Sequence, residues 1–215
     1  MRKIKKTPTE IEVKLRIANL PGILDRLKAI GAVSHGRVLE RNTLFDTPES
    51  DFRRSGRLLR VRIETPAPTG AQLGCRANSI LTFKSPPAAK SKSGSTAGSR
   101  HKARYKERAE SELPIQDPAN FVRILRSLGL RPGFRYEKFR TTFRLRGLHL
   151  DLDETPVGVI LELEGQPQAI DRAAKALGFA PSDYIRATYW DLYAADCRRR
   201  GVTPKNMLLP TQKSR

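Results

Sequence analysis

Cysteine is scarce in this chain of 215 residues. The two cysteines, Cys75 and Cys197, are far apart in the sequence and have no histidine or second cysteine at metal-ligand spacing. They predict neither a zinc site nor a framework of disulfides. This usage is typical of the cytoplasm, which is the location we expect.

Long apolar runs and glycine-rich phosphate loops are also missing. The basic start of the chain is followed by a charged stretch, so the sequence predicts no export signal and no membrane association. The lack of a P-loop disfavours a nucleoside kinase or a GTPase. Acids are few, with 22 acidic against 41 basic residues and a net charge of +19. That balance favours an anionic partner, such as a phosphorylated small molecule or a nucleic acid.

The chain does contain a recurring alternation of charged and aliphatic residues. In residues 10–17, Glu10, Glu12, Lys14 and Arg16 alternate with aliphatic side chains. In an extended strand these four charges share one face. Similar rows predict about eight strands in all, the others at residues 39–45, 60–63, 81–84, 106–112, 138–145, 148–153 and 161–164.

Eight charged strand faces require a special architecture, whereas one such face is ordinary solvated surface. We predict an α+β fold in which the eight strands close into an antiparallel barrel, with the charged face inward and helices packed outside. Ions in a dry interior are costly without partners, so the lumen should be wet and hold counter-ions. The pattern therefore predicts a tunnel for a polyanion and bound metal cations.

Helix signals divide the sequence further. Proline near the start and glycine after the end predict helices over residues 21–30, 118–128 and 167–177, and a fourth over residues 182–199. The order strand, helix, three strands then occurs twice. In the fourth helix we expect Tyr189 and Trp190 to pack in the core rather than to stack on a base.

The remaining segments form tails and an insertion. Residues 67–103, around the strand at 81–84, are rich in proline, alanine, glycine, serine and lysine and predict a long flexible insertion. Residues 1–7 and 198–215 are basic tails that flank one domain over residues 8–197.

Several motifs resemble the CYTH domain family, also called triphosphate tunnel metalloenzymes. They are Glu10-x-Glu12-x-Lys14, NTLFDTP at 42–48, LRVR at 59–62, LTFK at 81–84, Arg108-x-Glu110-x-Glu112, YEKFR at 136–140 and DETPVGVILELEG at 153–165. They follow the family order from about residue 8 to residue 195, which makes the resemblance specific. The family includes class IV adenylyl cyclases, thiamine triphosphatases and inorganic triphosphatases.

Carboxylates of the first and last strands are the candidate metal ligands. Hard divalent cations such as Mg²⁺ or Mn²⁺ prefer carboxylate oxygens. We therefore expect them at Glu10, Glu12, Glu162 and Glu164, with Asp153 and Asp151 as further choices. For each carboxylate the alternative is an ion pair with a lumen base, and Glu110 and Glu112 are expected to hold bases rather than a metal.

Basic side chains of the same rows are the candidate phosphate ligands, because guanidinium and ammonium groups bind phosphate oxygens. Arg60, Arg62 and Lys84 are the candidate catalytic residues, and the resemblance to thiamine triphosphatases permits Lys84 to activate water. The full set of expected substrate-binding residues is Lys14, Arg60, Arg62, Lys84, Arg108, Lys138 and Arg140.

Three functions stay open at this stage. The first choice is metal-dependent hydrolysis of tripolyphosphate, thiamine triphosphate or ATP, because it needs no pocket for a base and a ribose. The second is an adenylyl cyclase that makes cyclic AMP and pyrophosphate from ATP. The third is a non-catalytic module that binds polyphosphate or RNA through its basic charge. A homodimer is compatible with each of these functions.

Overall fold

The computed structural model describes residues 9–67, 77–87 and 104–210. Cys75, the tail at residues 1–7 and most of the expected insertion lie outside these ranges, whereas Cys197 is buried with a free thiol. The domain boundaries stay a prediction. None of the helices in the described ranges has the length and apolar character needed to cross a bilayer.

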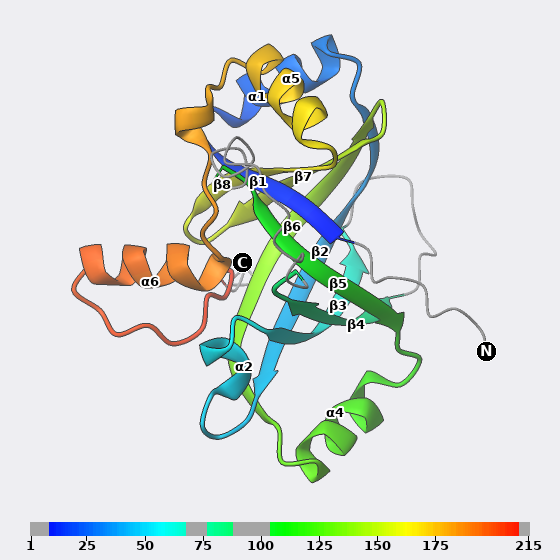
Figure 1. Cartoon of the computed structure of the whole chain (residues 1–215), viewed down its shortest axis with the longest axis vertical. Coiled ribbons are helices and arrows are strands. Elements are labelled where there is room, and N and C mark those ends of the chain that lie inside the picture. Colours follow the sequence, from blue (N-terminus) through cyan, green and yellow to red (C-terminus); the bar gives the residue numbers. More distant parts are fainter. Residues whose placement is uncertain (1–8, 68–76, 88–103, 211–215) are drawn as a thin grey trace, which may run out of the picture.

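Eight antiparallel strands close into a barrel, as the sequence predicts (Figure 1). The strand order around the barrel is β1-β5-β4-β3-β2-β6-β7-β8. The strands are β1 (Thr9–Ile17), β2 (Val33–Asp46), β3 (Leu58–Pro66), β4 (Asn78–Ser85), β5 (Lys106–Pro114), β6 (Arg131–Leu145), β7 (Leu148–Thr155) and β8 (Gly158–Glu164).

The repeated order of strand, helix and three strands is confirmed, with one short helix added in the first repeat. The helices are α1 (Leu20–Ala29), α2 (Asp51–Arg54), α4 (Pro118–Ser127), α5 (Pro167–Ala176) and α6 (Tyr189–Arg199). The Asn19 side chain accepts a hydrogen bond from the Gly22 amide at the start of α1, and Asp117 does the same for Asn120 at the start of α4.

The prediction of a fourth helix over residues 182–199 was wrong at its start. A 3-10 turn, Pro181–Asp183, is followed by extended chain, and α6 begins only at Tyr189. Thr188 and Asp191 form a capping box that fixes this start. The extended chain pairs with the barrel instead, because Lys14 and Ile185 exchange both backbone hydrogen bonds.

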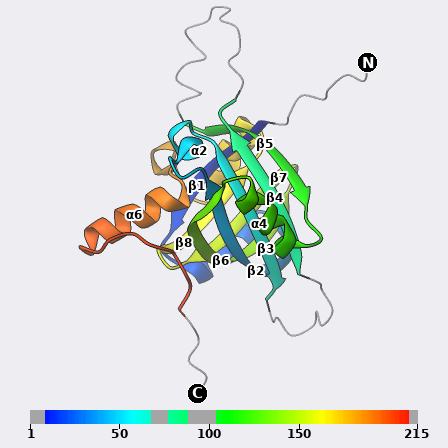
Figure 2. The same ribbon diagram turned by 90° about the horizontal axis from the view of Figure 1, so that it is seen from below.

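The apolar side of the strands faces outward under helices. Leu15 and Leu163 pack with Leu27 of α1 and Ile170 of α5 in the largest core cluster. In Figure 1, α1 and α5 cover one end of the barrel, α4 lies at the other end and α6 extends from the side. The view from below shows the same lateral position of α6 (Figure 2). The charged faces of the strands are thereby turned into the lumen.

Candidate functional site: the barrel lumen

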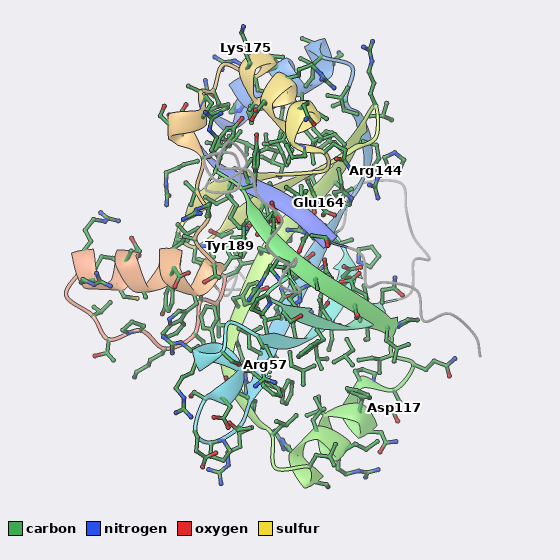
Figure 3. All side chains as sticks on the ribbon, viewed as in Figure 1. Arg57, Asp117, Arg144, Glu164, Lys175 and Tyr189 are labelled. Carbon is green, nitrogen blue, oxygen red and sulfur yellow. The ribbon has the colours of Figure 1, made fainter. Side chains whose placement is uncertain are left out.

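The barrel encloses a cavity of about 770 Å³. All eight strands contribute to its lining, together with α2 and α6. In Figure 3, Glu164 lies within the barrel, Tyr189 where α6 meets it and Arg57 beside α2. Twelve of the expected site residues line this cavity: Glu10, Glu12, Lys14, Arg60, Arg62, Lys84, Arg108, Lys138, Arg140, Asp151, Glu162 and Glu164.

Strand register explains how the candidate metal ligands meet. Strands β1 and β8 are neighbours, with Glu12 opposite Glu164 and Lys14 opposite Glu162. The Lys14 ammonium lies 2.9 Å from a carboxylate oxygen of Glu12 and 2.9 Å from one of Glu162. The first and last strands of the barrel thus bring acids from opposite ends of the sequence to one lysine.

Glu10 and Glu12 also contact bases of the strands on their other side. The Lys84 ammonium donates to both carboxylate oxygens of Glu10, at 2.8 and 2.6 Å, and lies 3.1 Å from Glu110. Lys106 lies 3.0 Å from Glu12. The alternative that the sequence left open, an ion pair with a lumen base, is therefore present for Glu10, Glu12 and Glu162.

Asp153 is placed differently from the other expected metal ligands. It is fully buried and does not line the cavity. Its carboxylate accepts hydrogen bonds from Lys138 at 2.7 Å and from Arg140 at 2.7 and 2.6 Å, and also one from the Tyr189 hydroxyl. A carboxylate with so many donors has little capacity left for a cation.

Arg140 is the most heavily paired cation of the described lumen. Its guanidinium lies 2.6 Å from Asp151, 2.6 Å from Asp153, 2.7 Å from Glu162 and 3.4 Å from Glu40. Burial alone would lower the pKa of Arg140, but these acids raise it well above its ordinary value. Arg140 stays charged, and its charge is already balanced.

Arg60 has the opposite surroundings. Its two terminal nitrogens donate to the Tyr136 hydroxyl at 3.2 Å and to the Thr82 hydroxyl at 3.0 Å, and Glu112 lies 3.8 Å away. Its Nε is buried and has no hydrogen-bond partner. A buried guanidinium paired mainly with hydroxyl groups retains the capacity to bind an anion.

Arg62 and Arg108 are the other predicted arginines of the lumen. Arg62 contacts Glu40 at 3.1 Å and Glu64 at 3.3 Å. Arg108 donates to the carbonyl of Gly56, beside the cavity.

Lumen charges shift the pKa values of their neighbours. Burial opposes the charge of Glu12, but Lys14 and Lys106 outweigh it and lower the pKa of Glu12 to about 2. Burial would lower the pKa of Lys14, and Glu12 and Glu162 raise it instead. Burial, Lys14 and Arg108 lower the pKa of Lys106, with Glu12 opposing them. Lys14 is therefore a fixed cation, whereas Lys106 releases its proton more readily than an ordinary lysine.

Several lumen residues were missed by the sequence analysis. Glu40 is fully buried among Arg62, Lys138 and Arg140. Glu40 lies inside the weakly alternating run of residues 39–45. Applying the two-residue period to that run would have placed Glu40 and Asn42 on one face of the strand. Tyr136, two residues before Lys138, follows from the same rule.

Tyr189 and Trp190 line the cavity as well, although the sequence analysis placed them in the core. Tyr189 is buried in an apolar cluster with Tyr136 and Tyr193, so the packing prediction holds for its ring. Its hydroxyl points to the lumen acid Asp153. Helical spacing alone did not distinguish the two roles.

Comparisons with known proteins agree with this architecture. A protein of Methanocaldococcus jannaschii named "Putative adenylate cyclase" is 23% identical over 194 residues, which cover 85% of this chain and 97% of that protein. The structure of a Vibrio parahaemolyticus protein, also titled "putative adenylate cyclase", has a TM-score of 0.69 at 17% identity and covers 87% of this chain and 98% of its own.

A plant protein has the same fold. The structure of HpAC1 from Hippeastrum matches with a TM-score of 0.53 at 19% identity, and the match covers 95% of this chain and 100% of that chain. Its title describes a putative adenylyl cyclase with a dominant triphosphatase activity. The family model of the CYTH domain matches residues 8–181. The closed barrel, its charged lumen and this match show that the chain belongs to the CYTH domain family.

Proposed function

We propose that this protein hydrolyses a triphosphate inside the barrel with the help of a divalent cation. The observation that carries the proposal is Arg60, a buried guanidinium on the cavity wall. Its carboxylate partner, Glu112, is 3.8 Å away, and its Nε lacks a hydrogen-bond partner among the described residues. A phosphate oxygen is the anion that fits such a fork of donors.

Arg62 on the same strand, Lys84 on β4 and Lys106 and Arg108 on β5 add positive charge along the same wall. Phosphoryl transfer depends mainly on positioning and on charge stabilisation, which this wall supplies. In hydrolysis a water oxygen bonds to the terminal phosphorus and gives up a proton, the bridging P–O bond breaks, and pyrophosphate or its ester leaves with the bridging oxygen while the transferred group becomes orthophosphate. We assign Arg60 and Arg62 to stabilising the negative charge of the transferred phosphoryl group, and Lys84 to activating the attacking water.

The acids of β1 and β8 suit a divalent cation. Glu10, Glu12, Glu162 and Glu164 provide hard carboxylate oxygens on adjacent strands. No group of three acids, histidines or cysteines is preassembled as a metal site among residues 9–67, 77–87 and 104–210. Mg²⁺ commonly binds through one or two carboxylates plus substrate phosphates, so these donors fit it. Such a cation would neutralise phosphate charge.

Asp153 is better assigned to the support of Lys138 and Arg140, because its carboxylate is enclosed by their donors. This restricts the proposed metal ligands to the acids that line the cavity.

The test is the product formed from two substrates. Purified protein with Mg²⁺ or Mn²⁺ should cleave tripolyphosphate to pyrophosphate and orthophosphate, and ATP to ADP and orthophosphate. Chromatography of the products distinguishes this from the second candidate, adenylyl cyclase, which the names of the relatives favour. If cyclic AMP is the main product from ATP and tripolyphosphate stays intact, the protein is an adenylyl cyclase and the hydrolase proposal is wrong. Binding without turnover would indicate a non-catalytic polyphosphate or RNA-binding module.

The metal assignment has its own test. Glu12→Gln keeps the shape of the side chain and removes its charge, so turnover should fall by roughly one to two orders of magnitude and recover in part with excess Mn²⁺. Glu154→Gln is the matched control, because Glu154 pairs with Arg37 and does not line the cavity. Equal turnover in the two variants would contradict the assignment.

A further inference from the structure

Tyr136 places a hydroxyl group beside the guanidinium of Arg60. It lies on the inward face of β6, is buried and lines the cavity. Its hydroxyl oxygen accepts a hydrogen bond from Arg60 at 3.2 Å. The phenol hydrogen is not used in that contact, and it has no acceptor among residues 9–67, 77–87 and 104–210. The hydrogen is therefore available to a molecule bound in the cavity.

The ring of Tyr136 is held firmly. Phe134 and Tyr189 stack against it, with ring centroids 5.5 and 5.6 Å away and planes at 19° and 24°. Met207, in the chain that follows α6, exchanges two backbone hydrogen bonds of 2.9 and 3.0 Å with the residues on either side of Tyr136. A phenol fixed in this way keeps its hydroxyl in one place, as proton transfer requires.

The two stacked tyrosines have opposite electrostatic surroundings. Tyr189 donates its hydroxyl to Asp153, and burial together with this carboxylate raises the pKa of Tyr189 well above its ordinary value. Burial would also raise the pKa of Tyr136, but Arg60 and two further lumen cations outweigh it and lower that pKa. Neighbouring groups whose pKa values are pushed apart are typical of acid and base catalysis.

Charged groups reach the Tyr136 hydroxyl from three strands. Arg60 and Arg62 of β3 and Lys138 of β6 favour the phenolate. Glu40 of β2 opposes it and is itself 3.1 Å from Arg62. The element α6 contributes the neutral tyrosine described above. The balance is positive, so a phenolate formed here is stabilised without any movement of the chain.

Arg60 also orients a bound phosphoryl group relative to Tyr136. Its two terminal nitrogens donate to different strands, one to Tyr136 of β6 and the other to Thr82 of β4. Lys84, which we assign to the attacking water, shares the face of β4 that carries Thr82. The attacking and leaving oxygens lie on opposite sides of phosphorus in an in-line displacement. Attack from the side of β4 leaves the bridging oxygen on the side of β6.

From this arrangement we propose that Tyr136 is the general acid of the reaction and donates its proton to the bridging oxygen of the leaving pyrophosphate. The inference rests on the proposed function and adds a catalytic residue to it. As the bridging P–O bond breaks, its electron pair stays on the bridging oxygen, the O–H bond of Tyr136 breaks and the proton moves to that oxygen. The proton given up by the attacking water passes to solvent, and solvent returns one to the phenolate.

The pH dependence of Tyr136→Phe tests this role, because the change removes the hydroxyl and keeps the stacked ring. With tripolyphosphate, kcat should fall roughly 10²- to 10⁴-fold, the range of a lost general acid. In the wild type, kcat should also fall as the pH rises through the lowered pKa of Tyr136, because a phenolate has no proton to give. This alkaline limb should be absent from the variant. A loss of kcat that is equal at every pH would make Tyr136 a positioning residue and overturn the inference.

Two further variants assign the alkaline limb to one residue. Tyr136→3-fluorotyrosine introduces a more acidic phenol of similar size, so the limb should move to lower pH. Tyr189→Phe is the matched control, since it removes the hydroxyl that donates to Asp153 and should leave the limb at the pH of the wild type. A limb that does not move with 3-fluorotyrosine, or that moves with Tyr189→Phe, would show that another group titrates.

Ultraviolet titration of the metal-free protein gives a readout that does not depend on turnover. The chain has five tyrosines. Burial is the first cause that raises the pKa of the other four, Tyr105, Tyr184, Tyr189 and Tyr193. The first phenolate to form as the pH rises should therefore belong to Tyr136 and be missing from Tyr136→Phe. Its persistence in that variant would contradict the inference.

The inference and the proposed function fail in different ways. If tripolyphosphate is hydrolysed and Tyr136→Phe keeps the alkaline limb, the inference is wrong and the function stands. If the wild type hydrolyses neither tripolyphosphate nor ATP, or cyclises ATP, the hydrolase proposal is wrong and the role of Tyr136 in it falls as well, even where the phenolate titration is as expected.

Discussion

Two walls of the barrel carry different charge. The base wall is formed by β3, β4 and β5 and the acid wall by β7, β8 and β1, and the two walls adjoin where β5 pairs with β1. The base wall carries Arg60, Arg62, Lys84, Lys106 and Arg108 with the acids Glu64, Glu110 and Glu112, and the acid wall carries Glu10, Glu12, Asp151, Asp153, Glu162 and Glu164 with Lys14 and His149.

Neutralisation is uneven between them. Arg140, beside the acid wall on β6, contacts acids at 2.6 to 3.4 Å, whereas Arg60 on the base wall has a carboxylate only at 3.8 Å. Charge pairing around Arg140 therefore stabilises the barrel, and the positive charge of Arg60 is available to a ligand. The other base-wall cations Arg62, Lys84 and Lys106 are themselves paired with acids. Stability and activity should respond to different substitutions.

The largest expected effect is on stability, from Asp153→Asn. This change leaves the buried Lys138 and Arg140 with less negative charge around them. Removing one partner of a buried ionic group typically costs about 3–5 kcal/mol, so the free energy of unfolding in urea should fall by that amount. Asp25→Asn, an exposed change on α1, is the control. A loss no greater than that of the control would refute a structural role for Asp153.

Arg60→Ala should affect activity instead. Removal of a charge-stabilising donor typically costs roughly 10²- to 10³-fold in turnover, and we expect a loss of this size with tripolyphosphate. The free energy of unfolding should change far less than in Asp153→Asn. Arg37→Ala on β2, which removes an arginine paired with Glu154 away from the cavity, should keep full turnover. If Arg60→Ala mainly unfolds the protein, the two walls do not differ as described.

The alternation of residues 10–17 and its repeats was enough to predict the closed barrel and its inward charges. Period-two patterns report which residues share a face, and eight such faces are compatible with few folds. The neighbour relation of Glu12 and Glu164 was not predictable, because strand order depends on tertiary pairing. The same limit hid the contrast between Arg60 and Arg140, whose local sequences are alike but whose partners come from other strands.

Aromatic residues show the complementary limit. Tyr189 and Trp190 follow each other at the start of α6, and helical periodicity cannot say that this start meets the barrel. Glu40 was missed for another reason, since its strand mixes polar and apolar residues on one face and the alternation there is weak.

Acid should weaken the acid wall first. The pKa of Glu12 is lowered from 4.5 to about 2, so its contribution to stability is complete above pH 4.5 and is lost as the pH falls toward 2. The free energy of unfolding lost over this window is on the order of 3 kcal/mol, since each unit by which the pKa is lowered corresponds to about 1.36 kcal/mol. Urea unfolding at several pH values should show that the free energy of unfolding depends less steeply on pH in Glu12→Gln than in the wild type. Identical slopes would contradict the ion pairing of Glu12.

The smallest effect is expected from deletion of residues 90–100, which lie outside the described residues. This segment carries Lys90, Lys92 and Arg100. Charge remote from the site acts on encounter with an anion and not on the chemical step, so kcat for tripolyphosphate should stay within about twofold of the wild type. At low salt kcat/KM should fall modestly, and the two proteins should converge as salt screens the charge. Binding of single-stranded RNA should lose part of its salt dependence in the same variant. A large loss of kcat would place the reaction outside the lumen, and the contrast between the two walls would then describe stability alone.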